Sequence, residues 1–130
     1  MTFSLSNILE QQRHIRFVEP NFEYEWGEAE RYPHYFSTKE QWLKLAQTGN
    51  IEIVNCSMLL TNTDMCRGKV KNLNPAKAKR ALVAIQKGVV ELPIFIKIGK
   101  RYELVAGNTR LTALHNLRLP TKAWVITVKK

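Results

Sequence analysis

Between Asn74 and Val128 the sequence changes three times between a helical and an extended pattern, and a Gly or Pro stands at each change. Asn74 is a natural helix N-cap, Pro75 suits the first helical position, and apolar residues recur at helical spacing until Gly88. The elements expected after Gly88 are a strand over 92–98, a hairpin turn at Gly99-Lys100, a strand over 101–105, a helix carrying Leu111, Leu114 and Leu117, and a strand over 123–128. This order predicts an α+β, or mixed α/β, fold.

The preceding sequence has a different composition. Residues 19–36 mix acidic with aromatic side chains, and Pro20, Gly27 and Pro33 interrupt any long regular element. We interpret this stretch as an ordered extended arm whose aromatic side chains pack on the main body.

One helix is predicted after the arm, because Ser37 or Thr38 can cap it, Glu40 completes a capping box and Gly49 can end it. Short strands over 51–53 and 57–60 and a polar, basic loop over 61–74 follow in the sequence pattern. The chain of 130 residues is close to the size of one domain. We expect residues 1–54 to be an extension packed on a domain of residues 55–130.

Composition excludes several classes of protein. With 45% hydrophobic and 24% charged residues, the chain is neither disordered, collagen-like nor a coiled coil. No apolar run is long enough to span a membrane, and the first residues lack the pattern of a secretory signal. The two cysteines, Cys56 and Cys66, have no zinc-like spacing with histidine, so we assign no metal ligand and expect free thiols in a reducing, cytoplasmic compartment.

The charge is unevenly distributed along the chain. Residues 1–50 hold five basic and seven acidic side chains, a net charge of −2, whereas residues 51–130 hold 15 basic and four acidic ones, a net charge of +11. A domain this basic attracts polyanions, and nucleic acid or a phosphorylated ligand is the expected partner. The alternative is that the lysines only keep the surface solvated.

A strand, a glycine turn and a helix start follow one another at residues 105–110, and this succession can bind an anion. The free N–H groups of a helix start attract anions, and Gly107 lets a ligand approach the backbone. Asn108 or Thr109 can cap the helix or bind a phosphate oxygen. Arg110 opposes the helix dipole, so it requires an anion or a carboxylate beside it. The alternative is a plain turn in which Arg110 pairs with Glu103 or Glu91.

The stretch from Glu91 to Ile126 resembles the ParB/sulfiredoxin superfamily. The order of elements is the family's order. A helix that ends in Gly is followed by a Pro-containing strand and a second strand; Gly-x-x-Arg, at Gly107–Arg110, then leads into an apolar helix, and a Leu-Pro step leads to a final strand. Upstream, Asn62–Arg67 is similar to the family's Asn-Pro-x-x-x-Arg loop, with Thr63 in place of Pro. The resemblance covers about residues 55–128 and implies a small sheet flanked by helices.

The resemblance also implies a pocket for the phosphates of ATP or CTP. By position, the phosphate-binding residues are Gly107, Asn108, Thr109 and Arg110, with Arg67 as a second cation. Glu91 and Arg110 are the candidates for catalysis. A Mg²⁺ ion would depend on Glu91, Glu103, Asp64 or the nucleotide itself.

Departures from the family pattern narrow the activities that the resemblance implies. Sulfiredoxins have their reactive Cys at the position of Asn108, so we do not expect sulfinic-acid reduction. The small-molecule kinases of this fold carry His-Thr-Arg where this chain has Asn108-Thr109-Arg110. The chain ends at Lys130 without the further parts of a partition protein, so we do not expect a role in DNA partition.

Taken together, these features predict a ParB-like protein that binds nucleotide phosphate and contacts nucleic acid, with nuclease or NTPase activity. The nucleic-acid contacts are expected at Lys69, Lys71, Lys77, Lys79 and Arg80. Three alternatives stay open: a DNA-binding or regulatory module without enzymatic activity that grips backbone phosphate, a small-molecule kinase, and an interaction protein whose arm docks on a partner or on its own basic half. A short, basic chain of this kind with an N-terminal arm is typical of a phage or mobile element. The sequence makes no prediction of the oligomeric state.

Overall fold

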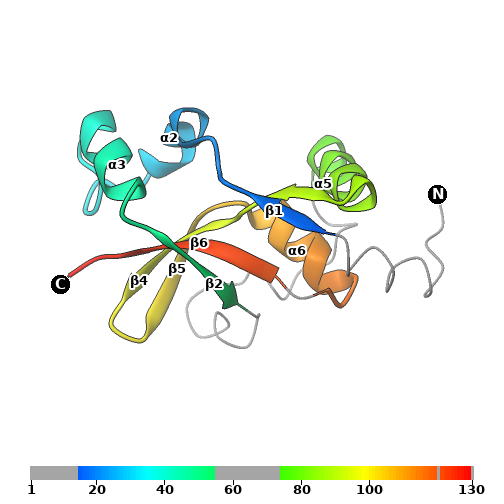
Figure 1. Ribbon diagram of the computed structural model, residues 1–130. Coiled ribbons are helices and arrows are strands. Elements are labelled where there is room, and N and C mark those ends of the chain that lie inside the picture. The colour runs from blue at the N-terminus through cyan, green and yellow to red at the C-terminus, as the bar shows by residue number, and fades with distance from the viewer. Residues whose placement is uncertain (1–14, 55–73, 120, 130) are drawn as a thin grey trace.

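The computed structural model describes residues 15–54, 74–119 and 121–129, which form helices and two small sheets (Figure 1). The elements are β1 (Arg16–Val18), α2 (Phe22–Ala29), α3 (Lys39–Ala46), β2 (Asn50–Val54), α5 (Pro75–Lys87), β3 (Val89–Glu91), β4 (Ile94–Ile98), β5 (Arg101–Ala106), α6 (Asn108–Asn116) and β6 (Thr121–Thr127). The predicted α+β class is confirmed.

The larger sheet has the strand order β2-β6-β4-β5. The strands β4 and β5 form the predicted hairpin, with Gly99 in a left-handed conformation at φ 60°. The strand β6 lies parallel to β4 and antiparallel to β2, which pairs with it over Asn50–Val54. The N-terminal extension therefore contributes an edge strand to the central sheet. A second sheet pairs β1 with β3 in parallel.

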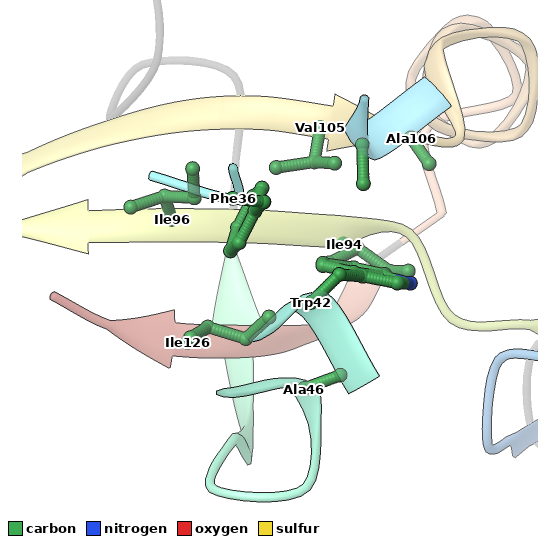
Figure 2. Packing of buried hydrophobic residues seen from close by; sticks show 9 residues of the cluster. Phe36, Trp42, Ala46, Ile94, Ile96, Val105, Ala106 and Ile126 are labelled. Atoms are coloured by element: carbon green, nitrogen blue, oxygen red, sulfur yellow. The ribbon is translucent and has the colours of Figure 1, made fainter. Parts of the chain in front are cut away.

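Helices pack on the two faces of the larger sheet. On one face, Ile94, Ile96 and Ile126 contact buried residues of α2, α3 and the segment between them, which are Ala29, Phe36, Trp42 and Ala46 (Figure 2). The opposite face carries Phe95, Leu104 and Val125, and Leu111 of α6 belongs to that cluster. The helix α5 packs on α6 through Ala81, Ile85, Ala113 and Leu114. The two helices of the basic half, α5 and α6, therefore lie together (Figure 1).

The predicted start and end of α5 and the predicted start of α3 follow from local capping, whereas α3 ends at Ala46 and not at Gly49. The Asn74 side chain accepts hydrogen bonds from the amides of Ala76 and Lys77, and Gly88 ends α5 in the left-handed conformation at φ 80°. Thr38 caps α3 by accepting from the Gln41 amide at 3.1 Å. The expected strand over 57–60 and the loop over 61–73 lie outside the described residues.

The prediction of an extended arm over residues 19–36 is wrong, because this stretch contains the helix α2. The Asn21 side chain caps α2 by accepting a hydrogen bond from the Tyr24 amide at 3.2 Å. Phe22, Trp26 and Ala29 then recur at helical spacing and pack against the core. Pro20, Gly27 and Pro33 suggested the extended arm, but Gly27 lies within α2 and the apolar period decides the structure. Most aromatic side chains of the arm pack against the core, as expected, but Tyr24 is 79% exposed.

Candidate functional site at the start of α6

The turn between β5 and α6 requires a glycine for two reasons. Gly107 has a φ of 99°, which side-chain-bearing residues rarely adopt. A Cβ atom added there would lie 2.8 Å from the Pro93 Cα and 2.8 Å from Nη2 of Arg110. The Arg110 guanidinium therefore lies directly against the turn, as a phosphate-binding role would require.

The expected side-chain cap of this helix is absent. Gly107 is the N-cap residue, and it has no side chain that could accept a hydrogen bond from the first turn of α6. Asn108 is already the first helical residue, and its side-chain oxygen accepts a hydrogen bond from the Thr112 hydroxyl at 3.3 Å. The prediction that Asn108 or Thr109 caps the helix is therefore wrong, because Gly107 in its left-handed conformation starts the helix one residue earlier.

The expected carboxylate beside Arg110 is present, and it comes from α2. Nη2 of Arg110 lies 3.8 Å from Oε1 of Glu25, and only 21% of the Arg110 side chain and 6% of the Glu25 side chain are exposed. Nε and Nη2 of Arg110 are both buried, and neither has a hydrogen-bond partner in the described part of the chain. The guanidinium is therefore neutralised by an ion pair but incompletely hydrogen-bonded.

The two acidic partners that the sequence suggested for Arg110 have other contacts. Glu91 accepts a hydrogen bond from the Asn21 amide at 2.8 Å, and so fixes the start of α2. Glu103 accepts one from the Tyr35 hydroxyl at 3.3 Å. The sequence analysis did not identify Glu25 as the partner of Arg110. The only feature that could have indicated it is that Glu25 belongs to the acidic stretch 19–36, whereas Arg110 belongs to the basic half of the chain.

The electrostatic surroundings of Glu25 are unfavourable to its charge. Burial raises the pKa of Glu25, the nearby Arg110 lowers it, and the carboxylates of Glu91 and Glu28 raise it further. The net effect is a raised pKa. With α2 in place, the corner therefore holds one guanidinium among several carboxylates, an arrangement that repels a further anion.

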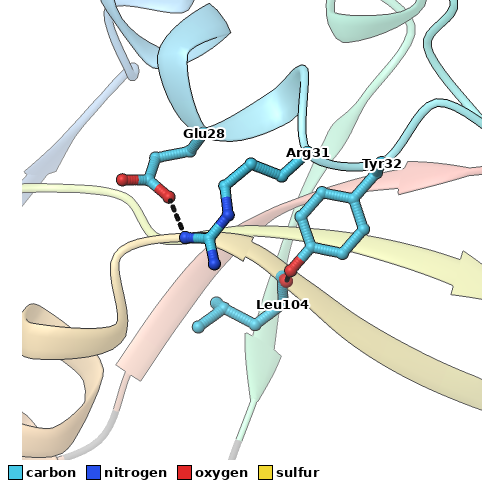
Figure 3. Close-up of polar contacts among 4 residues, drawn as sticks. All are labelled: Glu28, Arg31, Tyr32 and Leu104. Carbon is cyan, nitrogen blue, oxygen red and sulfur yellow. Dashed lines mark hydrogen bonds and ion pairs between the residues drawn. The ribbon is translucent and has the colours of Figure 1, made fainter.

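A tyrosine contact holds the segment after α2 to the sheet. The Tyr32 hydroxyl donates a 2.7 Å hydrogen bond to the carbonyl of Leu104 on the edge strand β5 (Figure 3). In the same view, Arg31 pairs with Glu28 at the surface of α2 at 3.3 Å. Burial, followed by the Glu103 carboxylate, raises the pKa of Tyr32, so its hydroxyl stays a hydrogen-bond donor.

A second group of predicted residues lies on α5, away from this corner. Lys77, Lys79 and Arg80 are exposed there. Lys87, which was not among the predicted contacts, is exposed near the end of the same helix. The predicted residues Arg67, Lys69 and Lys71 lie outside the described residues.

Residues 15–54, 74–119 and 121–129 contain no group of three His, Cys, Asp or Glu side chains placed to hold a metal ion. Within those ranges, no helix combines the length and the apolar character needed to cross a membrane. Comparison of the whole chain with protein-family models, curated proteins and solved structures finds no match.

Proposed function

We propose that this protein binds the phosphate backbone of nucleic acid through the exposed basic face of α5. The observation that carries the proposal is a helix with four exposed cations and no acidic residue, whose cations form no ion pair within the described residues. The cations are Lys77, Lys79, Arg80 and Lys87. The described ion pairs of the chain instead involve glutamates of α2: Glu23 with Lys39, Glu25 with Arg110 and Glu28 with Arg31.

Helix geometry puts most of these charges on one surface. Ala78, Ala81 and Ile85 are the buried residues of α5. At about 100° per residue, Lys79, Arg80 and Lys87 project from the side opposite this stripe, and Lys77 lies nearer its margin. The 13 residues of α5 extend for roughly 20 Å, enough for contacts with several successive phosphates.

The position of the charges within α5 also favours an external anion. Lys77 lies in the first turn, where a cation opposes the helix dipole at a cost of about 0.3–1 kcal/mol, and no acidic residue in that turn offsets it. A phosphate bound beside the first turns would remove this unfavourable interaction. Lys87, in the last turn, stabilises the helix in any case, so its position says less about a ligand.

The test is the salt dependence of duplex DNA binding. Each cation that contacts a phosphate contributes about 0.9 to the slope of log K against log salt. The double variant K79Q/R80Q should therefore lower the slope by about 2 and weaken binding at any DNA sequence. K44Q/K100Q, which removes two exposed cations from α3 and the hairpin turn, is the matched control. Equal slopes for the wild type and K79Q/R80Q would refute the proposal.

A second candidate function is binding of nucleotide phosphate at Gly107–Arg110, as the resemblance to the ParB/sulfiredoxin superfamily implies. It is supported by the buried Nε and Nη2 atoms of Arg110, which lack hydrogen-bond acceptors among the described residues. It ranks second because the Glu25 carboxylate already lies beside the guanidinium. Thermal shifts with ATP, CTP, GTP and ADP, with and without Mg²⁺, test it, since a bound ligand raises the melting temperature. Loss of the shift in R110Q is expected, and no shift with any nucleotide would refute it.

A further inference from the structure

The Glu25 carboxylate stands where an incoming phosphate would meet Arg110. It approaches Nη2 to 3.8 Å, which is longer than the roughly 2.7–2.9 Å of a charge-assisted hydrogen bond. Two guanidinium nitrogens in the same corner are buried without an acceptor in the described ranges. The carboxylate thus supplies a compensating charge but leaves donors that a phosphate, with more oxygens, would satisfy.

The pair is also poorly stabilised as an internal contact. Burying both charges costs solvation energy, which such a long contact recovers only in part. The carboxylates of Glu91 and Glu28 add negative potential at Glu25. An attachment of this kind is easier to displace than a short, fully hydrogen-bonded ion pair.

The helix that carries Glu25 is short and is held by hydrogen bonds near both ends and by one packed face. Before it, the Asn21 amide donates to Glu91 at 2.8 Å, and after it, the Tyr32 hydroxyl donates to Leu104 at 2.7 Å. Between these contacts α2 has only eight residues and packs on the core with one face. Departure of the Glu25 side chain from Arg110 should therefore loosen α2 between its two attached ends.

We propose that Glu25 is an internal plug of the turn at Gly107–Arg110, and that a phosphate-bearing ligand binds there by displacing its carboxylate from Arg110. This inference rests on the second candidate function and adds the regulation of that site. The ligand chemistry is a phosphate group with several free oxygens, supplied by a free polyphosphate or by a nucleic-acid backbone.

Calorimetric titration with inorganic tripolyphosphate tests the plug. E25Q removes the competing charge and should bind tripolyphosphate about 10- to 100-fold more tightly than the wild type. E23Q is the matched control, because it makes the same change on the same helix at a residue whose partner is the exposed side chain Lys39; its affinity should stay within about threefold of the wild type. R110Q should abolish binding.

The outcomes separate this inference from the functions proposed above. Equal affinities of E25Q and the wild type, with binding lost in R110Q, would refute the plug and leave the phosphate site standing. No binding by any variant would refute both the plug and the phosphate site. Neither result bears on α5, whose role is measured by the salt slope of K79Q/R80Q.

A measurement on the wild type makes the test independent of the folding of any variant. Tripolyphosphate should accelerate hydrogen exchange of the α2 amides without changing exchange in α3, because only α2 carries the displaced carboxylate. Unchanged exchange in α2 at saturating tripolyphosphate would refute the plug. Titrations of E25Q with ATP and with duplex DNA distinguish the two sources of phosphate: a gain for ATP alone indicates a free polyphosphate, and a gain for DNA indicates the backbone.

Discussion

Replacing Gly107 by alanine should destabilise the protein more than the same change at Gly27 or Gly99, where nothing lies within 4 Å of an added Cβ. At a φ of 99° an alanine is strained by about 1–3 kcal/mol. The new Cβ would also lie 2.8 Å from the Pro93 Cα, a backbone atom that cannot rotate away. Relieving such overpacking costs about 1–3 kcal/mol.

The reduced freedom of the unfolded alanine chain offsets about 0.4–1 kcal/mol of these terms. We therefore expect G107A to lower the free energy of unfolding by about 2–4 kcal/mol, which for a chain of 130 residues corresponds to a fall in melting temperature of roughly 8–15 °C. Urea denaturation followed by circular dichroism measures the free energy directly.

Two other glycines separate the strain from the steric term. Gly99 also has a positive φ, of 60°, but nothing lies within 4 Å of its added Cβ, so G99A should cost only about 1 kcal/mol. Gly27 lies in α2 with nothing within 4 Å, and G27A should stabilise the protein by about 0.5–1 kcal/mol through helix propensity. If G107A were no less stable than G99A, the close packing of Pro93 against the turn would be refuted.

Two further predictions concern the contacts of α2 and the segment that follows it. Burial raises the pKa of Glu25, so the folded protein binds this proton more readily than the unfolded chain; the resulting stabilisation is present below the ordinary pKa of about 4.5 and is lost as the pH rises through the folded value. E25Q should therefore gain stability relative to the wild type as the pH rises above about 4.5 in urea denaturation, and a difference that stays constant with pH would contradict this. Y32F removes the hydrogen bond to the Leu104 carbonyl and should cost about 0.5–1.5 kcal/mol, whereas Y24F, at a side chain that is 79% exposed, should change nothing measurable. Equal stabilities of Y32F and Y24F would show that the contact contributes nothing.

Local signals predicted α5 and the hairpin well. Asn74 and Gly88 mark the ends of α5 because their effects, a side-chain cap and a left-handed turn, act within a few residues. The Gly99-Lys100 turn is similarly local. Such signals hardly depend on the rest of the fold.

The sequence pattern misled where Gly and Pro were read as interruptions. Pro20, Gly27 and Pro33 suggested an extended arm, but Phe22, Trp26 and Ala29 bury one helical face against the core. The parallel pairing of β1 with β3 was also not predicted. A strand of three residues is too short for its periodicity to be recognised, and its partner is distant in the sequence.

The amino-acid sequence on its own determined the start and end of most helices and strands, the glycine at the turn before α6 and the need of Arg110 for a negative partner. Only the tertiary structure decided that this partner is Glu25. The position of Arg110 in the first turn of a helix indicates that it needs a negative partner, but several carboxylates in the sequence could have been that partner. Which of them reaches Arg110 depends on the packing of α2 against the sheet, a property of contacts between segments that are distant in the chain.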